Sequence, residues 1–292
     1  MDKNSSFIKS KNSLTCNGKI LNLSKPLVMG IINITPDSFY AKSQFMLKRR
    51  IASRAKEILV QGGSIIDIGA CSTRPGAKMV SEKEEITRLS KGLSVIRKKF
   101  PDAIISVDTF RANVAKYVVN HYNANIINDI SAGEMDEKMV ETVASLSVPY
   151  IAMHMQGTPQ DMQQNPRYEN VVKDLVTFFA SKVEKFYKAG IKDIVIDPGF
   201  GFGKTLEHNY TLLQNLDAFK VFGLPILVGL SRKSMIYKAL SINPDQALNG
   251  TSVLNTIALE KGANILRVHD VQEAIDAITL TSLTTNQPKG FM

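Results

Sequence analysis

Eight short apolar segments recur along this chain, and nearly every one ends in a polar residue. Longer segments with apolar side chains at helical spacing separate them. A sheet built in this way carries the polar ends of its strands to one rim, which is where a (β/α)8 barrel places its site. The apolar segments are Leu27–Asn33, Ile65–Gly69, Ala103–Asp108, Asn125–Asp129, Pro149–His154, Asp193–Asp197, Pro225–Gly229 and Ala263–His269.

The alternation predicts one α/β domain, a (β/α)8 TIM barrel over residues 14–282, between short tails at 1–13 and 283–292. A doubly wound open sheet is the competing topology, but eight strand–helix units favour a closed barrel. A capping box is expected at Ser81–Glu84. The predicted helices are Phe45–Gln61, Ser81–Phe100, Arg111–His121, Asp136–Ser145, Asn170–Ala189, Leu206–Lys220, Ala247–Lys261 and Val271–Leu280.

The segment Leu14–Leu23 has a different pattern. Asn17-Gly18 stands between two short alternating stretches, which indicates a type I′ β-hairpin. The hairpin precedes the first barrel strand, so we expect it to cover the lower mouth of the barrel.

Composition narrows the class of partner. The net charge of +9 indicates an acidic partner. The basic clusters 48–50 and 97–99 fall in separate helices without interleaved aromatics, which favours an anionic small molecule over nucleic acid. No apolar run reaches the roughly 20 residues that span a bilayer, so no membrane partner is expected. Two cysteines without metal-ligand spacing suit a reducing cytoplasm.

The segment Gly199–Thr205 resembles a phosphate-binding loop without being one. A Walker A loop needs a glycine five residues before its last glycine. Here that position is Pro198, which has no backbone N–H to offer a phosphate. We interpret the segment as a turn that follows Asp197 and brings backbone close to a ligand.

Four polar residues at strand ends form the strongest candidate for a binding site. Asp108 and Asp197 end apolar runs, Asn128 ends another, and Lys233 follows a fourth. Carboxylates facing a lysine and an amide match a flat heterocycle with donor and acceptor edges, such as a pterin or a guanine. The alternative is that each aspartate caps the helix after it.

Arg267 and His269 stand two apart on the last strand, so their side chains leave on the same face. We expect them to bind a phosphate, because phosphate sites in these barrels lie near the last strands. The alternative is a structural ion pair with an aspartate. The four histidines show no zinc-binding spacing, and no thiol is placed for nucleophilic catalysis.

Two polar loops follow the first two strands, Asn33–Phe39 and Cys71–Gly76, and are long enough to be lids. Asn33 and Asp37 offer the hard oxygen atoms that Mg²⁺ prefers when it is shared with a phosphate.

These motifs, taken in order, resemble the dihydropteroate synthase family over about residues 14–282. The matching stretches are Asn-Ile-Thr-Pro-Asp-Ser-Phe, Ser-Thr-Arg-Pro-Gly, Ser-Val-Asp-Thr, Ile-Asn-Asp-Ile, Met-His-Met-Gln-Gly, Asp-Pro-Gly-Phe-Gly-Phe-Gly-Lys, Gly-Leu-Ser-Arg-Lys-Ser and Arg-Val-His-Asp-Val. The family joins 6-hydroxymethyl-7,8-dihydropterin pyrophosphate to p-aminobenzoate in folate synthesis, releases pyrophosphate, and is the target of sulfonamides.

The resemblance implies a role for each matching residue. Catalysis would rest on Asp108, Asp197, Lys233, Arg267 and His269. The pterin pyrophosphate would be bound by Thr73, Asp108, Asn128, Met153, Asp197, Lys233, Arg267 and His269. The p-aminobenzoate would be bound by Phe39, Arg74, Pro75, Phe202, Lys233 and Ser234, and Mg²⁺ by Asn33. The resemblance also implies a homodimer formed through the later helices.

The chain departs from the family's pattern in both lids. It has Tyr40-Ala41-Lys42-Ser43 where the family commonly has Ser-Asp-Gly-Gly, and Gly69-Ala70-Cys71 where it often has Gly-Gly-Glu. Thr73 and Arg74 are retained, so we expect activity. Two other functions stay open, a pterin-binding methyltransferase-type barrel and a non-catalytic pterin-binding module.

Overall fold

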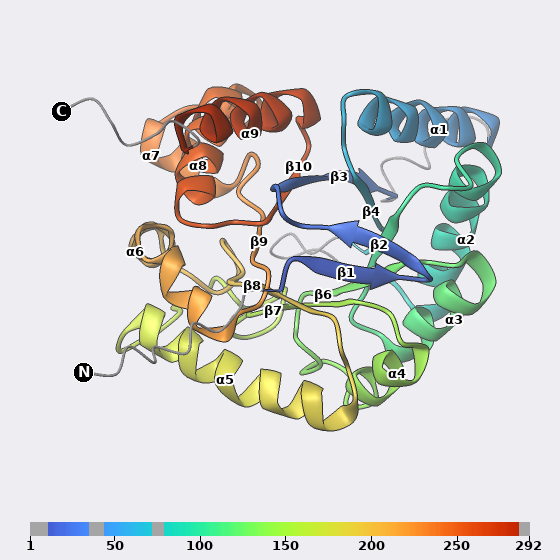
Figure 1. Ribbon diagram of the computed structural model, residues 1–292, viewed down its shortest axis with the longest axis horizontal. Coiled ribbons are helices and arrows are strands. Elements are labelled where there is room, and N and C mark those ends of the chain that lie inside the picture. The colour runs from blue at the N-terminus through green and yellow to red at the C-terminus, as the bar shows by residue number, and fades with distance from the viewer. Residues whose placement is uncertain (1–10, 35–43, 72–78, 286–292) are drawn as a thin grey trace, which may run out of the picture.

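Eight parallel strands form a sheet that closes on itself at the centre of the protein (Figure 1). The computed structural model describes residues 11–34, 44–71 and 79–285. A bridge between Ile196 and Ile226 joins the two ends of the sheet, which confirms the predicted barrel. Its strands, in order around the barrel, are β3 (Leu27–Asn33), β4 (Ile65–Gly69), β5 (Ile105–Asp108), β6 (Ile126–Asp129), β7 (Tyr150–Met153), β8 (Ile194–Asp197), β9 (Leu227–Val228) and β10 (Ile265–Val268).

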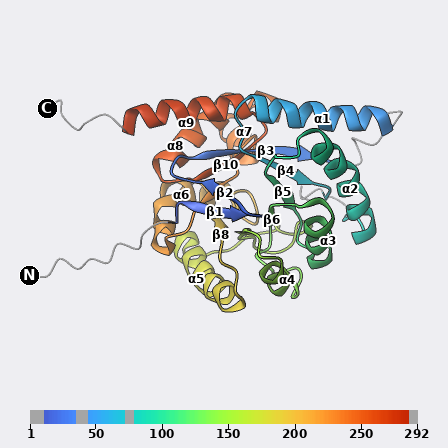
Figure 2. The same ribbon diagram turned by 45° about the vertical axis from the view of Figure 1, so that its right-hand side comes forward.

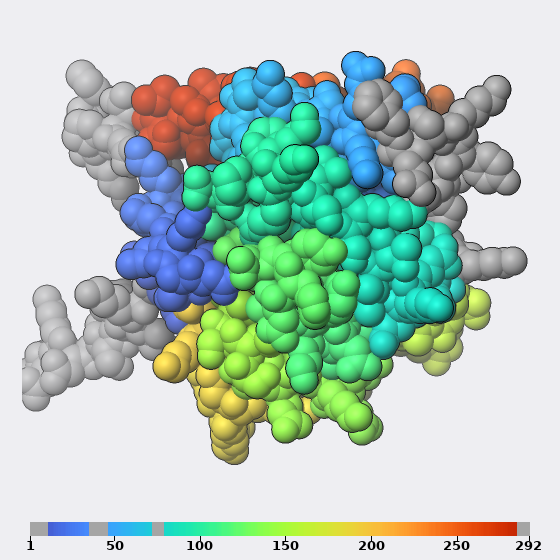
Figure 3. All heavy atoms as spheres, turned by 90° about the vertical axis from the view of Figure 1, so that its right-hand side faces the viewer, coloured from blue at the N-terminus to red at the C-terminus, as the bar shows by residue number. Residues whose placement is uncertain are grey.

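Helices surround the strands (Figures 1 and 2). Seen from the side of α2, α3 and α4, they cover the barrel wall (Figure 3). The α-helices are α1 (Gln44–Val60), α2 (Glu82–Lys99), α3 (Ala112–Tyr122), α4 (Met139–Leu146), α5 (Val171–Ala189), α6 (Leu206–Gln214), α7 (Ser234–Leu240), α8 (Leu248–Glu260) and α9 (Val271–Thr285). Two 3₁₀ turns lie at Leu216–Phe222 and Pro244–Gln246.

Three helices differ from the sequence prediction. The helix expected over 206–220 breaks at Asn215, where the backbone leaves the helical region and the chain continues as a 3₁₀ turn. Helix α7 was not predicted, because its seven residues are too few for a clear helical period. Helix α9 continues to Thr285, five residues beyond its predicted end at Leu280.

The predicted capping box at the start of α2 is half formed. Ser81 Oγ accepts the backbone N–H of Glu84 at 3.2 Å, as expected. The Glu84 carboxylate does not return to the cap and instead pairs with Arg88, one turn along α2. The competing partner explains why the second half of the motif is missing.

The hairpin β1 (Ser13–Cys16) and β2 (Lys19–Asn22) closes the bottom of the barrel. Its turn residues Asn17 and Gly18 both have positive φ, as a type I′ turn requires. Leu14 and Cys16 are fully buried against the lowest layer of inward side chains, which includes Met29 and Ile265. The prediction of a hairpin that covers this mouth is confirmed.

The hairpin gives a test of how much the bottom layer stabilises the barrel. Replacing the fully buried Leu14 with Ala should lower the free energy of unfolding by about 2–5 kcal/mol, because it removes apolar contacts and leaves a cavity. Urea denaturation followed by circular dichroism measures this. The matched control is Ile20→Ala on the same hairpin, where the side chain is 76% exposed and the expected change is close to zero. Equal effects of the two substitutions would contradict the hairpin's role as a plug.

Candidate active site

The strand register brings the predicted polar residues to one end of the barrel. Asp108 and Asn128 are partners across β5 and β6. Met153 and Asp197 are partners across β7 and β8. Asn33, the last residue of β3, is exposed beside Gly69 of β4. These are the carboxyl ends of the strands, where barrels of this class carry their sites.

Arg267 lies between two carboxylates at this end. Its Nε donates to Asp67 Oδ2 at 2.7 Å, and its NH2 group donates to Asp108 Oδ2 at 2.9 Å. Burial opposes the charge on Arg267, but the two aspartates hold its pKa above the usual value. The structural ion pair weighed as the alternative for Arg267 therefore exists, and it joins Arg267 to the residues predicted to bind the heterocycle.

Asp108 is a strongly perturbed carboxylate of the site. Burial above all raises its pKa to about 7, a value to which the nearby Asp67, Glu85 and Asp129 also contribute and which Arg267 opposes. A carboxylate with a pKa close to neutrality in a barrel mouth is typical of a functional group. The alternative of a simple helix cap does not describe Asp108, whose side chain points to Arg267.

Asp67 is a site residue that the sequence analysis missed. It is fully buried on β4, and Asn128 Nδ2 lies 3.4 Å from its Oδ2. The candidate residues were chosen mainly at the ends of strands, whereas Asp67 stands two residues before the end of β4. The alternation of side chains along a strand would have found it, because a residue two before the end faces the same way.

Asp197 and Lys233 form a second charged group across the mouth. Burial raises the pKa of Asp197, an effect that Lys233 opposes. Asp197 Oδ1 accepts the backbone N–H of Gly199 at 2.7 Å. Burial lowers the pKa of Lys233 to about 8, with Arg267 adding to the effect and Asp197 opposing it.

The Lys233 amine also meets the loop that follows β8. Its Nζ donates to the carbonyl of Phe200 and lies 4.5 Å from the centre of the Phe202 ring. Phe202 packs against a small apolar cluster that contains the predicted Met153. Ser234 follows Lys233 directly as the first residue of α7 and is half-buried.

His269 is held by Ser231 at the rim. The Ser231 hydroxyl accepts the backbone N–H of His269 at 3.1 Å and lies 3.0 Å from Nδ1 of the ring. The hydroxyl proton is then available to Nδ1, which leaves the ring proton on Nε2. Desolvation and the charge of Arg267 lower the pKa of His269 to about 4, so the ring is a neutral donor at pH 7.

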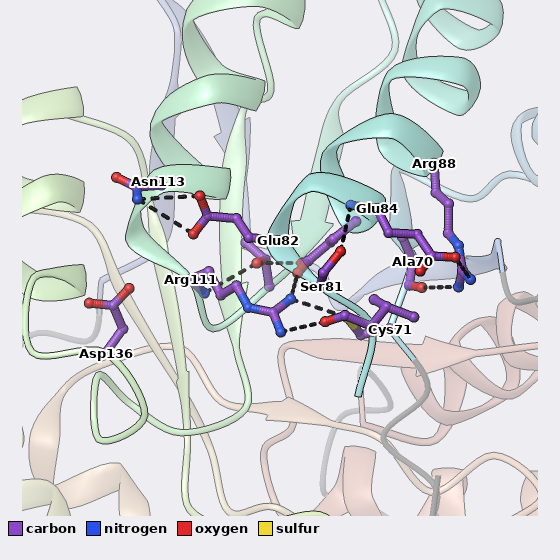
Figure 4. A network of polar contacts seen from close by, with 12 residues as sticks. Ala70, Cys71, Ser81, Glu82, Glu84, Arg88, Arg111, Asn113 and Asp136 are labelled. Carbon is purple, nitrogen blue, oxygen red and sulfur yellow. Dashed lines mark hydrogen bonds and ion pairs between the residues drawn. The ribbon is translucent and has the colours of Figure 1, made fainter. Parts of the chain in front are cut away.

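A network of polar contacts holds the residues on both sides of segment 72–78 (Figure 4). Arg111 donates to the carbonyl of Val80 at 2.7 Å, lies 3.6 Å from Cys71 Sγ, and pairs with the fully buried Glu85. Arg88 donates to the carbonyl of Ala70 at 3.1 Å. Helices α2 and α3 thus fix the points where the second polar loop leaves and rejoins the barrel.

Some predicted site residues lie outside the described ranges. These are Phe39, Thr73, Arg74 and Pro75, together with Asp37 and the departing segment Tyr40–Ser43.

The sequence predicts no catalytic role for the two thiols or for the histidines other than His269. Among the described residues, no cluster of three or more His, Cys, Asp or Glu could hold a metal ion. His154 is buried and His121 is exposed. Burial raises the pKa of both Cys16 and Cys71 to about 12, so neither thiol is activated. In residues 11–34, 44–71 and 79–285, no helix is long and apolar enough to cross a membrane.

The fold and the site define a class, a (β/α)8 barrel enzyme with acidic and basic side chains gathered at the carboxyl ends of its strands. Residues 29–269 match the model of a family described as pterin binding enzyme. The dihydropteroate synthase of Haemophilus influenzae is 44% identical over 275 residues, which cover 94% of this chain and 99% of the relative. That of Escherichia coli is 40% identical over 273 residues, with 93% and 96% covered.

Solved structures agree. Yersinia pestis dihydropteroate synthase in complex with a sulfonamide drug superposes with a TM-score of 0.86 at 40% identity, over 94% of this chain and all of that one. The Xanthomonas albilineans enzyme with 4-aminobenzoic acid gives 0.88 at 35% identity, over 96% of this chain and 100% of that one. The chain belongs to the dihydropteroate synthase family.

The contact between Asp67 and Arg267 gives a test of the site's electrostatics. Asp67→Asn should lower the pKa of Asp108 by about one unit. The substitution removes a like charge near Asp108, and Arg267 then no longer shares its positive charge between two carboxylates. A carbon-13 NMR titration of the aspartate carboxyl groups measures the pKa. The control is Asp217→Asn, an exposed aspartate on the 3₁₀ turn, which should change nothing. An unchanged or higher midpoint for Asp108 in the Asp67 variant would contradict the arrangement.

Proposed function

We propose that this protein joins 6-hydroxymethyl-7,8-dihydropterin pyrophosphate to p-aminobenzoate and releases pyrophosphate, the dihydropteroate synthase reaction. The observation that carries the proposal is the meeting of Asp108, Asp197, Lys233 and Arg267 at one end of the barrel. Two carboxylates and two cations around one site suit a ring with donor and acceptor edges that carries an anionic leaving group.

The pterin half of the substrate suits the residues that lie deepest. The carboxylates of Asp108 and Asp197 would accept the ring N–H groups, and the Asn128 amide and Lys233 amine would serve the acceptor edge. Met153 would line the ring, and Arg267 would stack on it. Asn128 and Asp197 are buried on strands, so they are held rigidly in place.

The pyrophosphate half suits the rim of β3 and β10. Arg267 offers a planar fork of N–H groups, and His269 offers its neutral Nε2–H, oriented by Ser231. Thr73 would contact the same substrate. A pKa of about 4 leaves His269 neutral at pH 7, so of these two residues only Arg267 is charged.

Mg²⁺ fits this rim through Asn33. The Asn33 side chain is exposed at the end of β3, and within the described part of the chain its amide makes no hydrogen bond. A hard oxygen atom from one amide, completed by water and pyrophosphate oxygens, is a donor set that Mg²⁺ accepts. When bound, the ion would neutralise charge on the departing pyrophosphate.

The p-aminobenzoate would lie on the loop side of the site. The Lys233 amine lies 4.5 Å from the centre of the Phe202 ring, and Ser234 follows Lys233 at the start of α7, which supports this placement. Phe39, Arg74 and Pro75 would complete the wall. An aryl amine is neutral at pH 7, so no strong general base is needed. We propose that pyrophosphate departs first and that the amine then captures the ring-stabilised cation, which Asp108 and Asp197 favour electrostatically.

The alternative functions explain the residues less well. A methyltransferase-type barrel would need the two aspartates and the asparagine, but neither Lys233 with Ser234 nor the pair Arg267 and His269. A non-catalytic pterin-binding module would need no pyrophosphate site. The Ser231–His269 contact, which orients a donor at the rim, favours turnover over binding alone.

Turnover assays distinguish the three functions. With pterin pyrophosphate, p-aminobenzoate and Mg²⁺, the protein should release pyrophosphate and form dihydropteroate in equal amounts, and chelation of the metal should slow the reaction. Asp197→Asn should lower kcat/KM by about 100-fold or more, because it removes a charge that favours the transition state. Glu207→Gln, an exposed change on α6, is the control. Pterin binding without turnover would identify a binding module, and pyrophosphate release that yields no dihydropteroate would overturn the synthase.

The pH profile tests the two perturbed groups. Asp108 must be ionised, so kcat/KM for the pterin substrate should rise as pH passes about 7, and Lys233 must be charged, so it should fall above about 8. Lys233→Arg keeps the charge to high pH and should abolish the fall on the alkaline side. Ionisation of the substrate is the same for both proteins, which makes the comparison its own control. An alkaline limb that persists in the arginine variant would contradict the assignment.

Three consecutive helices suggest the surface of the proposed homodimer. Exposed large apolar side chains on α7, α8 and α9 include Leu240, Val253, Leu280 and Leu283, each more than half exposed. Their burial between two copies would remove apolar area from water. Sedimentation should show a dimer that Val253→Asp with Leu280→Asp converts to monomers.

A cytoplasmic location is the accompanying proposal, supported by the two unpaired cysteines.

A further inference from the structure

Lys204 stands where a phosphate-binding lysine would stand in a Walker loop, yet the structure turns it inward. Its side chain is 3% exposed. The Nζ donates to the carbonyls of Gly199 and Phe202, both at 3.0 Å, and lies 3.0 Å from His154 Nδ1. A third carbonyl, that of His154, is 3.3 Å away. An amine committed to these partners does not bind a ligand.

The loop that Lys204 contacts, residues 199–203, needs an external support. Gly199, Gly201 and Gly203 all have positive φ, and glycine loses more conformational freedom on ordering than any other residue. The loop also lies directly on the chain after β7. A Cβ atom on Gly199 would come within 1.9 Å of the His154 carbonyl oxygen, so no larger residue fits.

The same loop carries two contacts to Lys233. The Phe200 carbonyl accepts a hydrogen bond from Lys233 Nζ, and the Phe202 ring lies 4.5 Å from that nitrogen. Lys204 therefore bonds to the loop at residues 199 and 202, on either side of the carbonyl that fixes Lys233. If the loop moved, both the ring and the amine would lose their places.

We propose that Lys204 is a positioning residue for the p-aminobenzoate half of the site, because it holds the 199–203 loop and thereby places Phe202 and Lys233. The inference rests on the proposed function, which assigns both residues to the p-aminobenzoate wall and Lys233 to the pterin as well. Asp197 and Arg267 are carried by strands β8 and β10, so the pterin half depends on the loop much less.

The tether works in either protonation state of Lys204. Burial lowers its pKa well below the usual value, against the attraction of Asp197. A neutral amine still has two N–H groups, enough for the carbonyls of Gly199 and Phe202, and a charged one has three. His154 is neutral, since burial and Lys204 lower its pKa to about 2, and its Nδ1 can accept or donate.

Lys204→Met tests the proposal because it keeps the length of the side chain and removes every donor. The KM for p-aminobenzoate should rise by about tenfold or more, whereas the KM for the pterin pyrophosphate, which shares Lys233 but is also held by strand residues, should rise by a smaller factor. Amide hydrogen exchange in residues 199–203 should become faster than in wild type, because the loop loses its fixed contacts.

A second variant and a control separate positioning from general loss of stability. Tyr168→Phe removes a weaker tether, the 2.8 Å bond from the Tyr168 hydroxyl to the Gly203 carbonyl, and should raise the KM for p-aminobenzoate in the same direction by a smaller factor. Leu14→Ala weakens the barrel from its far end and should leave both KM values unchanged.

The outcomes separate this inference from the proposed function. Equal increases in both KM values, or unchanged exchange in residues 199–203, would overturn the role of Lys204. Absence of turnover in the wild-type protein would instead count against the proposed function, and the exchange measurement would still decide whether Lys204 tethers the loop.

Discussion

The site depends on the ion group in which Arg267 lies between Asp67 and Asp108. Asp67 is fully buried, so its charge is tolerated only because a cation meets it inside the barrel. The group fixes Arg267 at the mouth. Burial is the largest cause of the raised pKa of Asp108, and the group adjusts that pKa through one cation opposed by several carboxylates. Binding chemistry at the rim thus rests on a charge arrangement one layer below it.

That arrangement explains why the barrel is built as it is. The layer under Asp67 is apolar, with Met29 and Ile265 closed off by Leu14 of the hairpin, so water does not reach the charges from below. The short β9 supplies only two residues to the sheet, but Lys233 and Ser231 follow it into the site. The shortest strand of the sheet thus lies next to functional residues.

Much of the fold could be read from the sequence. Strands were found because buried parallel strands are uniformly apolar and end in a polar residue, as Asp108 and Asp197 show. Asp108, Asn128, Asp197 and Arg267 were found because side chains at strand ends share one rim. The short α7 was missed, because it has too few residues for a period, and Asp67 was missed because it lies inside an apolar run.

Other features depend on contacts that no local pattern reveals. Lys204 has the sequence context of a ligand-binding residue, and only the position of His154, fifty residues away in the chain, shows that it faces inward. The neutral state of His269 follows first from its burial and then from the charge of Arg267. The orientation of its ring depends on Ser231, 38 residues away in the chain.

The hairpin closes the lower end of the barrel, so reactants and products enter and leave at the other end. A molecule that reaches Asn128 and Asp197 must pass the loops that carry Phe202 and Ser234. In the proposed arrangement, p-aminobenzoate bound on those loops lies between a bound pterin and solvent. Dissociation of the pterin would then require p-aminobenzoate to leave first.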